Sequence, residues 1–235
     1  MTRIMATSPE QYAFPPLEAA SPEGLLAVGG DLNPQRLLSA YRQGIFPWYS
    51  AGQPILWWSP DPRAILYPAQ VRISRSLRKK LRQRNFTITS DTVFQDVIKR
   101  CAEPRPEQPG TWITAEMKSA YTALHQLGHA HSVETWLGSQ LVGGLYGITI
   151  GKAFFGESMF SRVSDASKAA LVSLASLLAA QDYHFIDCQV ASAHLESLGA
   201  QSIPRLHFTQ QLADAVNCEP DPRIWNLETS GGQFI

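Results

Sequence analysis

The sequence predicts an α+β fold in which helices flank a mixed sheet and a small N-terminal domain precedes it. Three short β patterns follow one another at 131–137, 140–150 and 153–161, separated by turn signals, which is typical of a meander. Helical patterns precede and follow this meander along the chain. The first sixty residues are instead rich in loops and aromatic side chains, so we expect domains at 1–62 and 63–235.

The composition indicates a cytoplasmic protein. Its 235 residues, 44% of them hydrophobic, suffice to bury a core without disulfides or metal ions. The three cysteines are too far apart in the sequence for a disulfide framework or a CxxC metal site, which favours a reducing compartment. No segment approaches the ~20 apolar residues that cross a bilayer, so we expect no membrane partner.

Local signals place the helices. Asn33 precedes Pro34 as an N-cap, and Gly44 ends that helix. After a strand at 85–90, Asp91 is expected to cap an amphipathic helix, and after the Pro-rich loop EPRPEQPG a second helix is expected from Thr114. A third helix follows the meander with Asp165 as its cap; a strand at 184–191 and a short helix before Gly199 come next.

This order of elements resembles the GCN5-related acyltransferase fold. Acyltransferases that use coenzyme A bind its pyrophosphate at a glycine-rich turn before the helix that follows the meander. Here that turn reads SRVSDASK and contains no glycine. A coenzyme A-dependent N-acyltransferase is therefore an alternative function that the turn disfavours, although a helix N-terminus still attracts anions.

A basic tract follows the N-terminal region although the formal net charge is zero. Seven of the 20 basic residues fall in it with no acid between them: Arg72, Arg75, Arg78, Lys79, Lys80, Arg82 and Arg84. Such a tract suits a phosphate backbone, with binding that weakens as salt rises. A solvated helix face is the alternative interpretation.

Three polar residues stand out in apolar surroundings, namely Glu157, Asp187 and Gln189. Burying such groups without partners costs several kcal/mol, so they are candidates for function. Asp187 and Gln189 are two apart on a predicted strand and are expected to share a face, with Cys188 on the opposite one. Contacts with loop amides are the structural alternative.

Several motifs together resemble the leucyl/phenylalanyl-tRNA–protein transferase family. They are GLLAVGGDL, YRQGIFPWYS, ILWWSPDPR, GTWIT, LGHAHSVE, LVGGLYG, GESMFSR, DASKAAL, FIDCQV and SLGAQSIPR, in order from about Gly24 to Arg205. The resemblance implies a bacterial enzyme, without a cofactor, that moves Leu, Phe or Met from aminoacyl-tRNA onto the N-terminal Arg or Lys of a protein and marks it for degradation. The loop at Pro104–Pro109 is longer than the family leads us to expect, and Leu145 stands where Met is familiar.

The implied reaction joins an amine to an ester carbonyl, so the protein must position two substrates and manage a proton rather than supply a nucleophile. Asp187 is the candidate to assist proton loss and Gln189 to orient the amine or ester, with transfer through the ribose hydroxyl as the alternative. Glu157 is the candidate to bind the α-ammonium group or the acceptor's cationic side chain. A structural salt bridge from Glu157 to Arg162 is the alternative.

The resemblance also implies a pocket for the transferred side chain. Its candidate walls are Leu145, Phe154, Met159 and Leu171, which the pattern alone would assign to the core. Flexible Met and Leu side chains adapt to several apolar guests.

Aromatic residues are the candidates to bind the end of the tRNA. Trp48 and Trp112 are expected to stack on the terminal adenine, although most tryptophans simply pack. Tyr41 and Tyr121 are expected at the rim.

The remaining expectations concern partners. His129 and His131 have no third ligand nearby, so we expect no metal site, and we expect a monomer. An RNA-binding module without turnover, using the basic tract and the tryptophans, is the non-enzymatic alternative.

Overall fold

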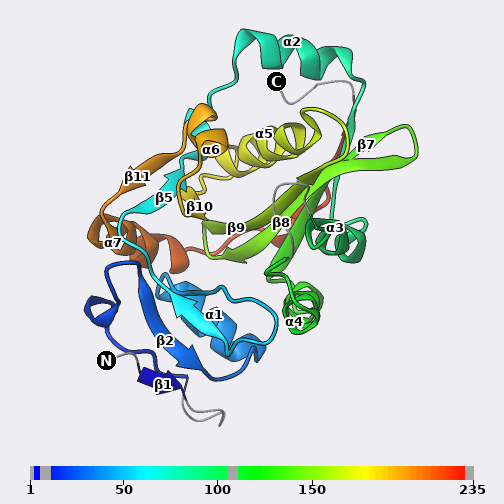
Figure 1. The fold of residues 1–235 in the computed structure, drawn as a ribbon. Coiled ribbons are helices and arrows are strands. Elements are labelled where there is room, and N and C mark those ends of the chain that lie inside the picture. Colours follow the sequence, from blue (N-terminus) through cyan, green and yellow to red (C-terminus); the bar gives the residue numbers. More distant parts are fainter. Residues whose placement is uncertain (1–2, 6–11, 105–110, 231–235) are drawn as a thin grey trace.

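A computed structural model describes residues 3–5, 12–104 and 111–230, and it contains two sheets (Figure 1). The smaller sheet has the order β1-β2-β4-β3, in which only β1 and β2 run parallel. Its strands are β1 (Arg3–Met5), β2 (Leu25–Gly29), β3 (Phe46–Pro47) and β4 (Leu56–Trp58).

The larger sheet has eight strands in the order β11-β5-β10-β9-β8-β7-β6-β12. β9 and β10 pair in parallel and every other pair is antiparallel, so the sheet is mixed, and β7-β8-β9 form the predicted meander. Its strands are β5 (Arg63–Leu66), β6 (Thr87–Ser90), β7 (Ala130–Leu137), β8 (Gln140–Ile150), β9 (Ala153–Ser161), β10 (Phe185–Gln189), β11 (Gln201–Ile203) and β12 (Glu228–Ser230).

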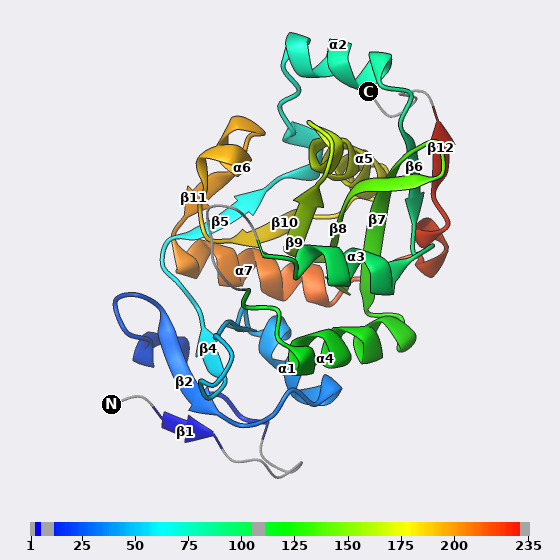
Figure 2. The same ribbon diagram turned by 45° about the vertical axis from the view of Figure 1, so that its right-hand side comes forward.

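Helices cover both faces of the larger sheet (Figures 1 and 2). α5 packs on one face with an apolar cluster that also includes residues of α2, and α1, α3, α4 and α7 pack on the other. The helices are α1 (Pro34–Arg42), α2 (Arg75–Gln83), α3 (Phe94–Cys101), α4 (Ala115–Gln126), α5 (Ala166–Ala179), α6 (Ala193–Ser197) and α7 (Arg205–Val216). Short 3-10 turns occur at η1 (Leu17–Ala19), η2 (Pro68–Gln70) and η3 (Pro222–Trp225).

The two sheets use different stretches of the chain. Strands of the smaller sheet lie within 3–58 and those of the larger sheet within 63–230. The expected α+β class, with a mixed sheet and a small N-terminal domain, is therefore confirmed. The boundary at residue 62 stays a prediction.

Two of the predicted helix caps are wrong in detail. Asp91 has φ +55° and its carboxylate accepts the amide of Ser132, while α3 begins after Val93. Asp165 occupies the cap position of α5, but its side chain accepts from Lys168 and makes no capping bond. In both cases the carboxylate is bonded to another donor. Asn33 caps α1 as predicted, and Thr114, predicted to start the second helix, caps α4.

The Pro104–Pro109 loop lies, apart from Pro104, outside the described residues. Within the described ranges, no helix is both long and apolar enough to cross a membrane.

Candidate active site

A cavity of about 440 Å³ opens where β9 and β10 separate. The parallel ladder between these strands ends at the pair Phe155 and Asp187, while β9 continues to Ser161. Residues from β8, β9, α5, β10 and α6 line the space beyond, which we call the cavity. The divergence of the two strands therefore leaves a hollow in the sheet, bordered by α5 and α6.

One wall of the cavity is apolar. The four side chains predicted for a pocket all line it: Leu145, Phe154, Met159 and Leu171. Three of them are at most 3% exposed, and Met159 is half-buried. The sequence offered two interpretations of these residues, core and pocket wall. Both describe them, because they pack in the α5-side core and also line the cavity. Leu174 and Ile186 line it as well and were not predicted.

The opposite wall is polar and centres on Glu157. Its two carboxylate oxygens each accept a hydrogen bond at 2.8 Å, one from the Tyr41 hydroxyl and one from the Tyr121 hydroxyl. The two hydroxyls are also 2.5 Å apart. Both tyrosines are fully buried, so the prediction that they form the rim is wrong. They anchor Glu157 instead.

Burial raises the pKa of Glu157 to about 7, and the two tyrosine hydrogen bonds oppose that effect because they favour the ionised form. The expected alternative, a salt bridge to Arg162, is wrong, since the Arg162 guanidinium lies 2.9 Å from the Glu103 carboxylate at the surface. Among the described residues, Glu157 therefore accepts from two tyrosines and forms no ion pair with a Lys, Arg or His side chain. An acid with this pKa can bind a substrate cation or exchange a proton near neutral pH.

Behind the polar wall lies a buried ion pair between Arg63 and Asp187. The Arg63 Nε and Nη2 atoms donate to the two Asp187 carboxylate oxygens at 2.8 and 2.6 Å, and Nη1 donates to the Gly44 carbonyl at 3.0 Å. Arg63 and Asp187 are fully buried, and the guanidinium lies against the rings of Phe46 and Phe208. Arg63 was not predicted, although an arginine in an apolar run after SPDP was a signal.

Gln189 and Cys188 lie differently from the prediction. β10 has an irregularity between Asp187 and Gln189, and Gln189 has φ +57°, so the strand alternation fails there. Gln189 and Cys188 both line the cavity, whereas Asp187 points toward Arg63. The prediction that Asp187 and Gln189 share a face is therefore wrong. They are joined instead by a hydrogen bond from the Gln189 backbone N–H to the Asp187 carboxylate at 2.9 Å.

Two buried polar groups of residues that line the cavity, the Gln189 Nε2 and the Tyr146 hydroxyl, have no hydrogen-bond partner among the described residues. Burial raises the pKa of the Cys188 thiol well above its ordinary range, which disfavours a thiolate nucleophile. Gln189 is thus available to a ligand in the cavity.

The two predicted stacking tryptophans occupy different places. Trp112 is half-buried and lines the cavity. Trp48 is 47% exposed, does not line the cavity and lies 6.0 Å from the Trp58 ring. Only Trp112 can touch a ligand that fills the cavity.

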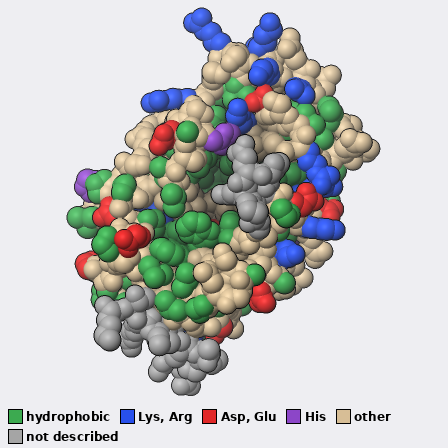
Figure 3. Space-filling view, in the orientation of Figure 1, with side chains coloured by type: hydrophobic (Ala, Val, Ile, Leu, Met, Phe, Trp, Pro, Cys, Tyr) green, Lys and Arg blue, Asp and Glu red, His purple; other side chains and the backbone are tan. Residues whose placement is uncertain are grey.

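The basic tract forms an amphipathic helix and its flanks. Leu77 and Leu81 of α2 are buried on the α5 side, in the same apolar cluster as the pocket residues. The cations face outward, and Figure 3 shows them gathered over α2 at the top of the view. Lys80 lies 3.6 Å from Asp165 at the start of α5. The tract is thus a charged surface packed on the helix that lines the cavity.

The histidines have structural contacts. His131 Nδ1 lies 2.7 Å from the Asp91 carboxylate, and its ring stacks on Trp225. In the described part of the chain, no group of three or more metal-ligating side chains comes together.

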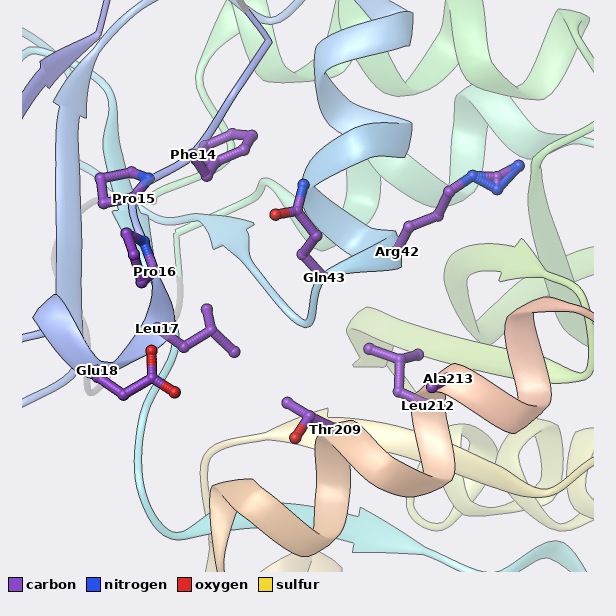
Figure 4. Close-up of a pocket in the computed structure, with 10 residues that line it drawn as sticks. All are labelled: Phe14, Pro15, Pro16, Leu17, Glu18, Arg42, Gln43, Thr209, Leu212 and Ala213. Carbon is purple, nitrogen blue, oxygen red and sulfur yellow. The ribbon is translucent and has the colours of Figure 1, made fainter.

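A second cavity of about 440 Å³ lies between α1 and α7 (Figure 4). Arg42 and Gln43 from the end of α1, and Leu212 from α7, border it together with the segment from Phe14 to Glu18. None of the residues predicted for the site lines it. The cavity at β9 and β10 is therefore the candidate active site.

Comparison with known proteins identifies the family. The sequence model described as "Leucyl/phenylalanyl-tRNA protein transferase" matches residues 65–213, and that of its N-terminal domain matches 30–61. The leucyl/phenylalanyl-tRNA–protein transferase of Aromatoleum aromaticum is 59% identical, over 92% of each chain. Those of Nitrosomonas eutropha and Methylococcus capsulatus are 58% and 54% identical, over 92% and 100% of this chain and 93% and 100% of theirs.

Among solved structures, L-PGS from Bacillus licheniformis aligns with a TM-score of 0.40 at 11% identity, covering 72% of this chain and 54% of that one. The likeness to GCN5-related acyltransferases therefore stays a prediction. The family is named as a transferase, which favours an enzyme over a binding module without turnover. From the matches along its length, the chain belongs to the leucyl/phenylalanyl-tRNA–protein transferase family.

Proposed function

We propose that this protein transfers an amino acid from aminoacyl-tRNA to the N-terminus of a protein. The donors are leucyl-, phenylalanyl- and methionyl-tRNA, and the acceptors begin with Arg or Lys and are thereby marked for degradation. A single chain acts in the cytoplasm, without a cofactor. The observation that carries this proposal is the cavity, which combines an apolar wall with an anchored Glu157.

The apolar wall suits the donor side chain. Leu, Phe and Met bury apolar surface against Leu145, Phe154, Met159 and Leu171, whereas a charged side chain would lose its hydration without compensation. The partly exposed Met159 is flexible and adapts to guests of different shape.

Glu157 suits a substrate cation. The two tyrosines fix its carboxylate, and no cationic side chain of the described residues forms an ion pair with it. Its charge is therefore free for the α-ammonium group of the donor or the cationic side chain of the acceptor. In a partly buried site such a charge-assisted contact is stronger than at the surface.

Gln189 and Asp187 have different roles in positioning the reacting groups. Both oxygens of Asp187 accept hydrogen bonds from Arg63. The role of Asp187 is therefore to hold the Gln189 backbone, by accepting a hydrogen bond from its N–H group, rather than to take the proton. The unpartnered Gln189 amide orients the attacking amine or the ester. The attacking amine first loses its ammonium proton to solution. It then forms the new amide bond while the ester bond breaks, and its surplus proton passes through the neighbouring ribose hydroxyl to the departing ribose oxygen.

The basic tract and the two tryptophans suit the tRNA. The cations contact phosphates, which carry no sequence information, and Trp112 stacks on the terminal adenine at the cavity, with Trp48 nearer the surface. Selectivity then depends on the esterified amino acid.

The direct test incubates the purified protein with radiolabelled leucyl-tRNA and a model protein with N-terminal Arg, and in parallel the same protein with N-terminal Ala. Label should pass only to the Arg protein. Equal labelling of both proteins would refute the preference for an N-terminal Arg acceptor. No labelling of either protein would refute the proposed transfer from leucyl-tRNA.

The role of the basic tract is tested by salt dependence. Replacing Arg75, Lys79 and Lys80 by Ala should lower the slope of log K against log salt for tRNA binding by about 2 to 3. Substituting Lys99 and Arg223, exposed cations outside the tract, should leave the slope unchanged. An unchanged slope in the triple variant would exclude the tract from tRNA binding.

A further inference from the structure

The C-terminal segment reaches the back of the apolar wall. Trp225, at the end of η3, is 6% exposed, and its ring stacks on His131 with centroids 4.0 Å apart and planes within 5°. The Trp225 ring also lies 5.8 Å from the Phe154 ring at 33°. The family model ends at residue 213, so this segment lies outside the matched region.

Several bonds fix the position of Trp225. Ser90 donates its hydroxyl to the Trp225 carbonyl at 2.7 Å, and the Leu227 amide donates to the same Ser90 hydroxyl at 2.9 Å. β12 then continues along β6 at the edge of the larger sheet (Figure 2). His131, whose ring stacks on the indole, is itself bound to Asp91. Trp225 is thus held by a ring stack on its side chain and by hydrogen bonds of its backbone and that of Leu227.

Gly147 explains why the indole can reach Phe154. His131 on β7 pairs with Gly147 on β8. A Cβ atom at Gly147 would lie 2.5 Å from two atoms of the Phe154 ring, so that ring covers the glycine. The missing side chain lets Phe154 lie across β8, where it meets the indole above His131. Phe154 therefore has the cavity on one side and Trp225 on the other.

We propose that Trp225 is a specificity-determining positioning residue, which sets how deep the aminoacyl side-chain site is by holding Phe154 against the cavity. This rests on the proposed function. With a smaller residue at 225, the Phe154 ring can withdraw into the vacated space. The site then becomes deeper, which favours the larger phenylalanyl group over the leucyl group.

The test measures kcat/KM with leucyl-tRNA and with phenylalanyl-tRNA for Trp225→Phe and Trp225→Leu. The ratio of phenylalanyl to leucyl transfer should rise with the volume removed, by about 3- to 10-fold for Trp225→Leu, because pocket differences of one methylene already change selectivity by 10-fold or more. The slope of tRNA binding against salt should stay unchanged, because the basic tract is intact.

A matched control separates selectivity from stability. Ile224→Ala removes a neighbouring buried side chain of the same cluster that has no ring contact with Phe154, so it should lower the melting temperature while keeping the donor ratio. A ratio within twofold of the wild type in either folded Trp225 variant, or a matching rise in Ile224→Ala, would overturn the inference. Should Trp225→Leu not fold, Trp225→Phe decides, with at least a twofold rise expected. A wild-type protein that transfers from neither donor would refute the proposed function itself.

Discussion

On the side of α1 and α4, the cavity wall consists of directional contacts: Glu157 accepts two tyrosine hydrogen bonds, and the Arg63–Asp187 ion pair lies behind it. On the side of α5, the wall consists of Leu145, Phe154, Met159 and Leu171, whose contacts have no preferred direction. When a buried polar group loses its partner, its desolvation penalty is no longer offset and the protein is destabilised by that amount. Apolar contacts, in contrast, tolerate substitutions of equal volume. Substitutions in the polar wall should therefore be costly, whereas the apolar wall should tolerate substitutions that conserve volume.

The largest effect is expected from the ion pair. Arg63→Met leaves Asp187 buried without its counter-charge and should lower the free energy of unfolding by about 3 to 5 kcal/mol. Urea denaturation would measure it. Arg223→Met breaks a pair that lies at the surface, with Arg223 85% exposed, and should not move the midpoint. If the two variants lose the same stability, the contrast between buried and exposed charge fails.

The second-largest effect is expected from the Glu157 carboxylate. Glu157→Gln keeps the shape but removes the charge, and should lower kcat/KM for transfer about 10- to 150-fold, the worth of a hydrogen bond to a charged group. The exposed Glu103→Gln is the control and should retain activity. Undiminished transfer by Glu157→Gln would show that the substrate cation is bound elsewhere.

The pH dependence sharpens the same point. Because folding raises the pKa of Glu157 from about 4.5 to about 7, its stabilising contribution is complete below pH 4.5 and is lost as the pH rises through 7. Activity that needs the carboxylate should increase over the same interval. Both trends should disappear in Glu157→Gln, and a rising activity limb that persists in this variant would assign it to another group.

A smaller effect is expected from the tyrosines. Tyr121→Phe removes a hydrogen bond that favours the ionised Glu157, so the midpoint of the activity limb should move upward by about half to one pH unit. Tyr67→Phe removes a tyrosine hydroxyl that bonds Gln211 instead, and serves as the control. A downward movement in Tyr121→Phe would contradict the assigned role.

The smallest effect is expected on the apolar wall. Met159→Leu conserves volume approximately and should change the free energy of unfolding by less than about 1.5 kcal/mol, with transfer from leucyl-tRNA retained. Thermal unfolding and the transfer assay would test this together. A loss of transfer as large as that of Glu157→Gln would remove the distinction between the two walls.

What could be predicted from the sequence was local or repetitive. The meander follows from alternation and turns, and the caps at Asn33 and Thr114 depend on residues two or three positions away. The four residues expected in a side-chain pocket do line the cavity, but they were named through the family resemblance, because a core pattern does not reveal a hollow. Their role as that pocket stays a prediction.

What could not be predicted depends on distant partners. Arg63 and Asp187 are 124 residues apart and Tyr41 and Tyr121 are 80 apart, and no local pattern joins them. The displacement of Gln189 arises from a break in β10, which a strict period of two excludes. The tyrosines were expected at a rim because their chemistry permits it, while the partner that buries them was not visible.

The bond from Arg63 to the Gly44 carbonyl has a consequence for how the protein becomes active during synthesis. Gly44 and Arg63 leave the ribosome early, and α2 with its cations follows soon after, but Asp187 is made more than a hundred residues later. A nascent chain thus carries its basic tract long before it can neutralise the Arg63 guanidinium with Asp187 and hold the Gln189 backbone. Under the roles proposed above, binding of tRNA by the basic tract can therefore precede competence for transfer, which requires Asp187 and Gln189.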